Sequence, residues 1–245
     1  MRNTLFCFLF IGNFAMSQIT AFKSGEQLTY STSYQISGLY TNIAEINLSV
    51  FSTFTKKGNM LKLKGTAKTF SNFDSFFKIR DLYESVADPD NLNPLTFTRD
   101  IEEGPYSKTF LYSFNHNAKI ASGKETRKGK NRNYNVSIPV GCHDMISALY
   151  YVRAINLSVL KPGNKLILKV LIDDSVKTVS LNYNGKETLS TVLGSKSCYK
   201  FSASYPGGTF GTIWFTADNA KIPVSIEAKI PVGKGRITLT RAVGI

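Results

Sequence analysis

The chain is poor in the residues that most often build metal centres and catalytic nucleophiles. Its 245 residues include three cysteines and two histidines, His116 and His143. Zinc sites need clusters of Cys and His side chains at set spacings, and these few residues do not supply one. No glycine-rich stretch combines the lysine and the following helix of a phosphate-binding loop. We therefore expect no metal site and no cofactor.

Long hydrophobic runs are also missing beyond the N-terminal segment. A membrane-spanning helix needs about 20 consecutive apolar residues, and no later stretch approaches that length. We therefore expect no transmembrane segment.

There is no internal repeat, no low-complexity tract and no Pro/Ser-rich linker, and the length suits one large β domain. We expect a single antiparallel β domain over residues 18–245, and a monomer.

Acidic residues are scarce, with 17 against 30 basic residues and a formal net charge of +13. Such an excess of positive charge attracts anionic partners in general, including nucleic acid and lipid head groups. The densest basic run, Lys124 to Arg132, contains no aromatic residues on which bases could stack. This run is typical of a solvated hairpin tip, so we expect no nucleic-acid partner.

The N-terminal segment has the three parts of a cleavable secretory signal. Arg2 supplies the positive start, Leu5 to Ile11 form the apolar run, and Ala15-Met16-Ser17 is a small-x-small cleavage site. Cys7 lies inside the apolar run, without the small residues that precede a lipoprotein cysteine. We therefore predict a signal peptide over residues 1–17. The mature protein is then exported and soluble in the periplasm or cell envelope.

The dominant pattern in the remaining sequence is alternation of apolar and polar residues. Leu28 and Tyr30 share one face of a segment whose other face is polar, and residues 222–230 repeat the pattern. Such alternation is typical of antiparallel sheets with one buried and one solvated face. Asn184-Gly185 predicts a two-residue hairpin turn. We predict a mainly β protein. Its core is a large antiparallel curved sheet, or a partly open β-barrel, of about a dozen strands with one amphipathic helix.

The helix is predicted over residues 143–156. Met145, Leu149 and Val152 lie at positions i, i+4 and i+7 and form an apolar stripe. Asp144 is well placed to favour the positive N-terminal end of this helix. We expect the helix to pack against the concave side of the sheet or to plug the mouth of a barrel. Residues 72–77 are a weaker helical candidate.

Cys142-His143-Asp144 contains the residue types of a nucleophile, a base and an acid. Triads are assembled from distant parts of a chain, and adjacent residues at a helix start point in different directions. We therefore interpret the run as structural and expect no catalytic residues. A carboxylate pair drawn from Asp100, Glu102, Glu103 and Glu227 is the other route to a hydrolase, which spacing does not test.

Two cysteines, Cys142 and Cys198, remain after the predicted cleavage. Export to an oxidising compartment and an even count favour a disulfide between them. The other interpretation is a pair of buried free thiols, because a domain of this size does not need a covalent staple.

Several segments together resemble an exported bacterial family, domain of unknown function 3108. They are Gly25-Glu26-Gln27-Leu28-Thr29-Tyr30, the run from Cys142 to Arg153, Tyr183-Asn184-Gly185-Lys186-Glu187, and Ile213 to Asp218 followed by Ile222-Pro223-Val224. The similarity covers nearly the whole mature chain. The resemblance implies an envelope protein with a large antiparallel sheet, and it implies no catalytic residue.

Three functional hypotheses follow. The first is a non-enzymatic envelope protein that binds an apolar or amphiphilic, lipid-like ligand, because a curved sheet rich in apolar side chains commonly encloses such ligands. Its candidate ligand-binding residues are Tyr30, Phe97, Leu149 and Trp214. The second is a structural or protein-interaction module of the envelope with an envelope protein as partner. The third is a hydrolase.

Overall fold

The computed structural model describes residues 20–36, 39–206, 208–230 and 233–245. The predicted signal peptide, residues 1–17, lies outside the described residues, and it stays a prediction.

Fifteen strands in the described part of the chain join in one sheet, against about a dozen expected. They are β1 (Gln27–Ile36), β2 (Leu39–Thr55), β3 (Gly58–Thr69), β4 (Ile79–Ala87), β5 (Pro94–Glu103), β6 (Tyr106–Asn115), β7 (Ile120–Arg127), β8 (Lys130–Ser137), β9 (Cys142–His143), β10 (Lys165–Ile172), β11 (Ser175–Thr191), β12 (Gly194–Tyr205), β13 (Gly208–Thr216), β14 (Pro223–Ile230) and β15 (Gly233–Val243).

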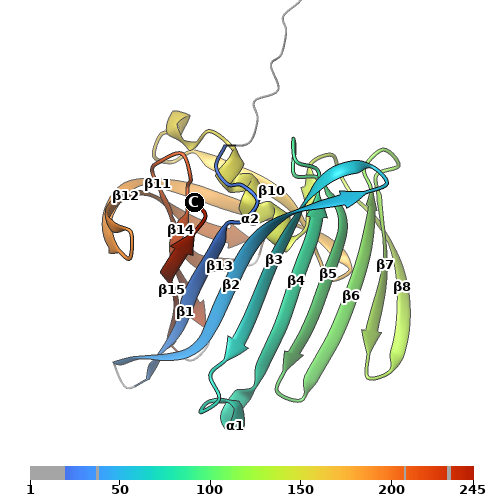
Figure 1. Ribbon diagram of the computed structural model, residues 1–245, viewed down its shortest axis with the longest axis horizontal. Coiled ribbons are helices and arrows are strands. Elements are labelled where there is room, and N and C mark those ends of the chain that lie inside the picture. The colour runs from blue at the N-terminus through green and yellow to red at the C-terminus, as the bar shows by residue number, and fades with distance from the viewer. Residues whose placement is uncertain (1–19, 37–38, 207, 231–232) are drawn as a thin grey trace, which may run out of the picture.

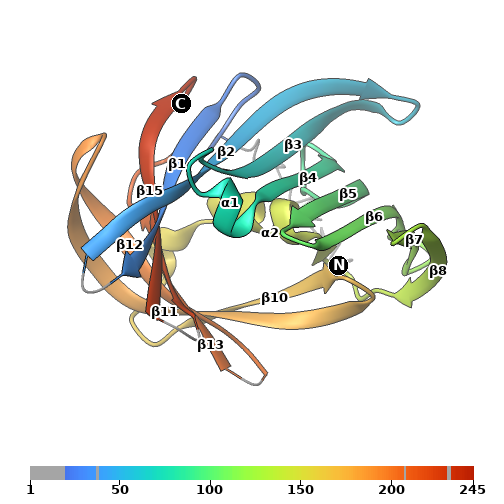
Figure 2. The ribbon, with the colours of Figure 1, turned by 90° about the horizontal axis from the view of Figure 1, so that it is seen from below.

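The sheet is a continuous meander whose two edges do not meet. The strand order is β8-β7-β6-β5-β4-β3-β2-β1-β15-β14-β13-β12-β11-β10-β9, so β1 and β15 pair in the middle. Neighbouring strands are antiparallel except β9 and β10, which are parallel. Figure 2 views the molecule from below and shows the sheet curling around its interior. The predicted curved, partly open architecture is confirmed, with one parallel pair added.

Asn184-Gly185 does not form the predicted hairpin turn. Both residues lie inside β11, where the register with β12 shifts between Tyr183 and Lys186. Gly185 has φ +101°, which glycine adopts without steric cost. A β-bulge uses the same permissive glycine as a tight turn does, so the dipeptide bends a long strand here and does not end it.

Two α-helices and one short 3₁₀ turn occur in the described residues: α1 (Asp74–Phe77), α2 (Met145–Ala154) and η1 (Leu157–Val159). Helix α2 is the predicted amphipathic helix, two residues shorter at each end than expected. It lies on the concave side of the sheet near its upper end, and α1 lies at the lower end (Figure 1). A Cβ added to Gly65 on β3 would lie 3.0 Å from Ile146 Cδ1, so the helix approaches that strand closely.

Three clusters of buried apolar side chains make up the described core. The first packs one side of α2 against β1, β2 and β3, with Leu28 and Tyr30 among its members. The second packs the other side of α2 against β10 to β13. The third lies between β5–β8 and the end of β10. Helix α2 therefore joins the two halves of the curved sheet through one packed interior.

A buried ion pair ties α2 to the start of the described chain. Arg153 donates from Nη1 and Nη2 to the two carboxylate oxygens of Glu26, both at 2.6 Å. Its guanidinium also donates to the carbonyls of Ala21 and Ala220, and it lies 5.1 Å from the ring centre of Phe22. The side chains of Arg153 and Glu26 are 1% and 0% exposed. We call this arrangement the Arg153 clasp.

Candidate functional site

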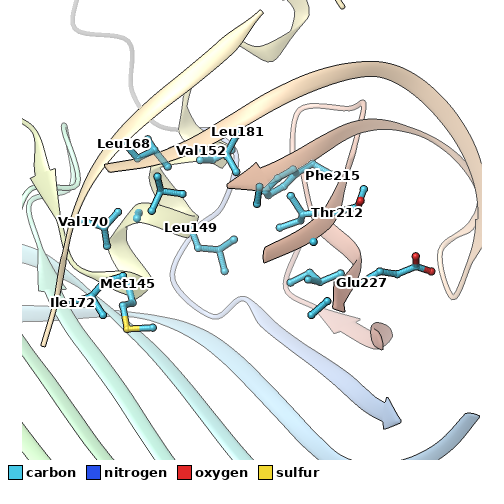
Figure 3. Close-up of a pocket in the computed structure, with 17 residues that line it drawn as sticks. Met145, Leu149, Val152, Leu168, Val170, Ile172, Leu181, Thr212, Phe215 and Glu227 are labelled. Carbon is cyan, nitrogen blue, oxygen red and sulfur yellow. The ribbon is translucent and has the colours of Figure 1, made fainter. Parts of the chain in front are cut away.

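The candidate site is an apolar pocket of about 260 Å³ beneath α2. One wall comes from the helix and the other from the concave face of β10 to β14 (Figure 3). Its lining residues are Met145, Ala148, Leu149, Val152, Leu168, Val170, Ile172, Val179, Leu181, Ala203, Gly211, Thr212, Ile213, Phe215, Ile226, Glu227 and Ala228. Thr212 and Glu227 are the two with polar side chains, so the pocket offers mainly van der Waals contact.

The pocket is closed under α2 and opens towards the β12–β13 turn. Phe215 is buried, whereas Gly211, nearer that turn on β13, is partly exposed. Ala203 on β12 and Ala228 on β14 pair with Gly211 across the strands and are also partly exposed. In an antiparallel meander the β12–β13, β1–β2 and β3–β4 connections lie at one end of the sheet. The mouth therefore faces the lower end of the molecule.

The helical stripe predicted from the sequence lines the pocket. Met145, Leu149 and Val152 come from successive turns of α2 and point into it (Figure 3). Asp144 fixes where the helix begins, because its side chain accepts from the backbone N–H groups of Ile146 and Ser147 at 2.9 Å. The start of the roof of the pocket is therefore set by Asp144, which the sequence placed in the first turn of the helix and the structure places at its N-cap.

Of the four candidate ligand-binding residues, Leu149 lines this pocket and the other three do not. Tyr30 is buried in the first core cluster, and Phe97 is buried in the third. Trp214 belongs to the first cluster, and its indole Nε1 donates to Glu187 at 3.0 Å. The structure therefore does not bring the four residues together.

Sequence reasoning missed the wall formed by the strands. Residues 165–172 read KLILKVLI, an almost continuous apolar run with little alternation. Such a run does not tell which face of a strand points inward. Leu168 and Val170 face the second cluster, whereas Leu171 faces the third, because the tip of β10 passes between both. The high apolar content of residues 165–172 was the feature of the sequence that could have indicated this wall.

A charged group lines the concave face of β4 and β5, apart from the pocket. Arg99 forms an ion pair with Asp173 at the β10–β11 turn, and its guanidinium lies 5.7 Å from the ring centre of Tyr83. Asp81 accepts from the backbone N–H of Glu102 at 3.3 Å. Burial, reinforced by the nearby Glu103 carboxylate, raises the pKa of Asp81 to about 6. Ionised Asp81 is therefore disfavoured in the folded protein.

This raised pKa gives a testable pH dependence. Between pH 4 and 6 the folded protein keeps the Asp81 proton more tightly than the unfolded chain, so stability should fall as pH rises through this range. Asp81→Asn should remove that fall and stabilise the protein at pH 8 by about 2 kcal/mol. Urea unfolding at several pH values measures it. Asp100→Asn, on the outer face of β5, is the control and should leave the profile unchanged.

Cys142, His143 and Asp144 make separate contacts in the structure. Burial raises the pKa of the Cys142 thiol to about 11, which disfavours the thiolate that a nucleophile requires. Burial lowers the pKa of His143 to about 4, and its Nδ1 lies 3.1 Å from the carbonyl oxygen of Leu92. Asp144 caps α2.

The candidate disulfide is not formed. Cys142 and Cys198 are both buried free thiols. Cys142 lies on β9 and Cys198 on β12, with β10 and β11 between them. Three strand spacings amount to about 14 Å, whereas a disulfide needs Cα atoms within about 7 Å. Cys142 faces the third core cluster and Cys198 the first, so the alternative of two buried thiols describes this structure.

The described residues lack two features that would indicate other functions. No helix among them is both long and apolar enough to cross a bilayer. They contain no group of three or more His, Cys, Asp and Glu side chains placed to hold a metal ion.

Two of the carboxylates named as candidates for a hydrolase pair form ion pairs. Glu227 borders the pocket and pairs with Arg236 at 2.7 Å. Glu102 pairs with Lys78, also at 2.7 Å.

Fold and site together define a partly open, β-barrel-like protein with an apolar pocket under its internal helix. The chain belongs to the DUF3108 family, described as proteins of unknown function, whose profile matches residues 29–240. This confirms the resemblance found in the sequence. No curated protein matches the chain.

Two solved structures of low sequence identity were matched to the chain. The β-barrel-like protein of domain of unknown function DUF1849 from Brucella abortus is 9% identical, with a TM-score of 0.59 over 89% of this chain and 96% of that one. A protein with a YmcC-like fold from Bacteroides fragilis is 10% identical, with a TM-score of 0.39 over 91% and 97% of the two chains. The first likeness supports the fold alone.

Proposed function

We propose that this protein is a non-enzymatic binding protein of the cell envelope that holds an apolar or amphiphilic ligand beneath α2. The observation that carries the proposal is the pocket's lining, in which fifteen of the seventeen residues have no polar side-chain group. Each methylene group moved from water into such surroundings contributes about 0.8 kcal/mol. Thr212 and Glu227 are the two lining residues with polar side chains, and no histidine or cysteine lines the pocket with them, so binding is the activity that the lining supports best.

The volume of the pocket limits the size of the ligand that it can hold. At about 260 Å³, the pocket lies just below the range of about 300–1,000 Å³ that is usual for drug-sized ligands. It therefore suits one hydrocarbon chain or a small apolar molecule, and it is too small for both chains of a two-chain lipid. Thr212 pairs with Ser202 and Glu227 across the strands, so these three side chains share the face of the sheet opposite the pocket. The pocket itself therefore presents apolar side chains to a ligand.

Export is part of this proposal, and the Arg153 clasp is consistent with it. The first residue that the clasp holds is Ala21, whose carbonyl accepts from Arg153 Nη2 at 3.1 Å. Cleavage after Ser17 would leave this contact and the Glu26 ion pair intact. The alternative of an envelope interaction module stays a prediction.

Blocking the mouth should abolish binding. Ala203→Phe places a ring at the partly exposed border of the pocket, where it competes with the ligand for the same space. We expect at least a tenfold loss of affinity for the fluorescent apolar probe N-phenyl-1-naphthylamine. Fluorescence titration measures it.

The matched control is Ser202→Phe, which adds the same ring to the neighbouring residue on the opposite face of β12. This variant should bind the probe like the unmodified protein. Equal binding by all three proteins, or no saturable binding by the unmodified protein, would argue against the pocket as a ligand site. Lipid extraction followed by mass spectrometry would then identify what the purified protein carries.

A further inference from the structure

One end of the molecule combines the pocket's mouth with exposed aromatic and basic side chains. The β5–β6 and β7–β8 turns, the start of β2 and helix α1 all lie at the lower end in Figure 1. We call this end the open rim. The upper end carries α2 and the β2–β3 turn. Variants at the open rim can therefore be compared with variants at the upper end.

Helix α1 on the open rim is held in place by a polar side chain. Asp74 Oδ1 accepts from Thr69 Oγ1 at 2.5 Å and from Arg80 Nη1 at 3.0 Å. Its phenylalanines point outward, with Phe76 85% exposed and Phe77 51% exposed. A short helix fixed by a polar network, with none of its residues buried, does not stabilise a core. Its exposed rings are therefore available to an external partner.

Neighbouring parts of the rim add apolar and basic side chains. Leu39 and Tyr40 begin β2 at this end and are exposed. The β7–β8 turn presents Arg127, Lys128 and Lys130, all exposed. Aromatic rings beside cations are the combination that sits at the boundary between lipid tails and head groups. Basic residues add attraction to anionic head groups.

We propose that the open rim docks on a lipid bilayer that carries anionic head groups, with Phe76 and Phe77 entering the interface and the β7–β8 turn contacting the phosphates. The apolar groups stand on separate turns along a rim and do not line one groove, which suits a broad, flat partner more than a peptide. The net charge of +13 favours an anionic surface. Docking in this orientation would point the pocket's mouth at the membrane. The proposal stands on the rim's side chains and does not require that the pocket binds a ligand.

Vesicle co-sedimentation tests the proposal directly. The purified protein, with its N-terminus established by mass spectrometry, is mixed with vesicles of phosphatidylethanolamine and phosphatidylglycerol. It should bind these at least tenfold more tightly than vesicles of phosphatidylcholine alone, and added salt should weaken the binding. Phe76→Ser with Phe77→Ser should reduce binding at least tenfold, and Lys128→Glu with Lys130→Glu should do the same.

The upper end supplies matched controls. Phe54 beside the β2–β3 turn is 84% exposed, almost the same as Phe76, and Lys56 and Lys57 are exposed next to it. Phe54→Ser, and Lys56→Glu with Lys57→Glu, should leave vesicle binding unchanged. Thermal unfolding confirms that every variant is folded. The proposal is overturned if the unmodified protein does not bind anionic vesicles, or if the upper-end variants lose as much binding as the rim variants.

Discussion

Replacing Arg153 with methionine should lower the free energy of unfolding by about 3–5 kcal/mol. Methionine keeps much of the volume between the rings of Phe22 and Tyr150, each 5.1 Å from the guanidinium carbon. What is lost is the positive charge that neutralises Glu26 in a fully buried position. An uncompensated buried carboxylate is more costly than the ion pair was stabilising. Calorimetry should show a melting temperature lower by about 10 °C, for a chain of this size.

Two further variants separate charge from packing in the clasp. Arg153→Met combined with Glu26→Met removes both charges and should recover part of the lost stability. Recovery should be incomplete, because the carbonyls of Ala21 and Ala220 also lose a donor. Arg241→Met, an exposed arginine on β15, should change stability by less than about 0.5 kcal/mol. A loss from Arg153→Met no larger than this control would show that the clasp is not needed for folding.

The clasp also shows where local sequence patterns stop being informative. Glu26 and Arg153 both lie in the segments that carried the family resemblance, yet 127 positions separate them in the chain. Alternation and helical periodicity describe which residues share a face, and they contain no information about which faces meet. By residue type alone, a carboxylate and a guanidinium are both expected to face solvent. Their burial is decided by tertiary packing, when α2 closes against the first residues of the described chain.

Within single elements the sequence was a good guide. Leu28 and Tyr30 were placed on a buried face, and both are buried. The stripe on α2 was read correctly because three side chains on one helical face need no information from another segment. The Asn184-Gly185 prediction failed because a permissive glycine serves a bulge as well as a turn. The strand wall of the pocket was missed because buried strands read as plain apolar runs.

The tertiary arrangement places three of the four candidate ligand-binding residues outside the pocket. Tyr30, Phe97 and Trp214 are large and mainly apolar, and these properties suit them to the packed core in which they lie. The pocket instead exists where the facing residues are small, as Ala148, Ala203, Gly211 and Ala228 are. Because protein interiors are otherwise close-packed, small residues on facing elements leave a cavity that larger side chains would fill. A search for small residues on converging faces needs the fold first.

Asp144→Ala should be the other strongly destabilising substitution, costing about 3 kcal/mol. The carboxylate accepts from two backbone N–H groups of α2 and from Ser85 Oγ on β4 at 2.6 Å, all in a buried site. Loss of an N-cap costs about 1 kcal/mol, and each buried donor left without a partner adds about 1–3 kcal/mol. Urea unfolding measures the change in stability. The same variant should bind the apolar probe more weakly, because α2 is the roof of the pocket.

Asp144→Asn is the informative companion to this variant. Its amide oxygen still accepts from Ile146 and Ser147, and its amide nitrogen can donate to Ser85. Burial raises the pKa of Asp144, so the folded protein already disfavours the ionised form, and a neutral amide should be tolerated with a loss below about 1 kcal/mol. If asparagine costs as much as alanine, the negative charge itself holds the helix start. If both cost little, the packing of Met145, Leu149 and Val152 fixes α2 without its cap, and the roof of the pocket is set by the ligand-facing side chains themselves.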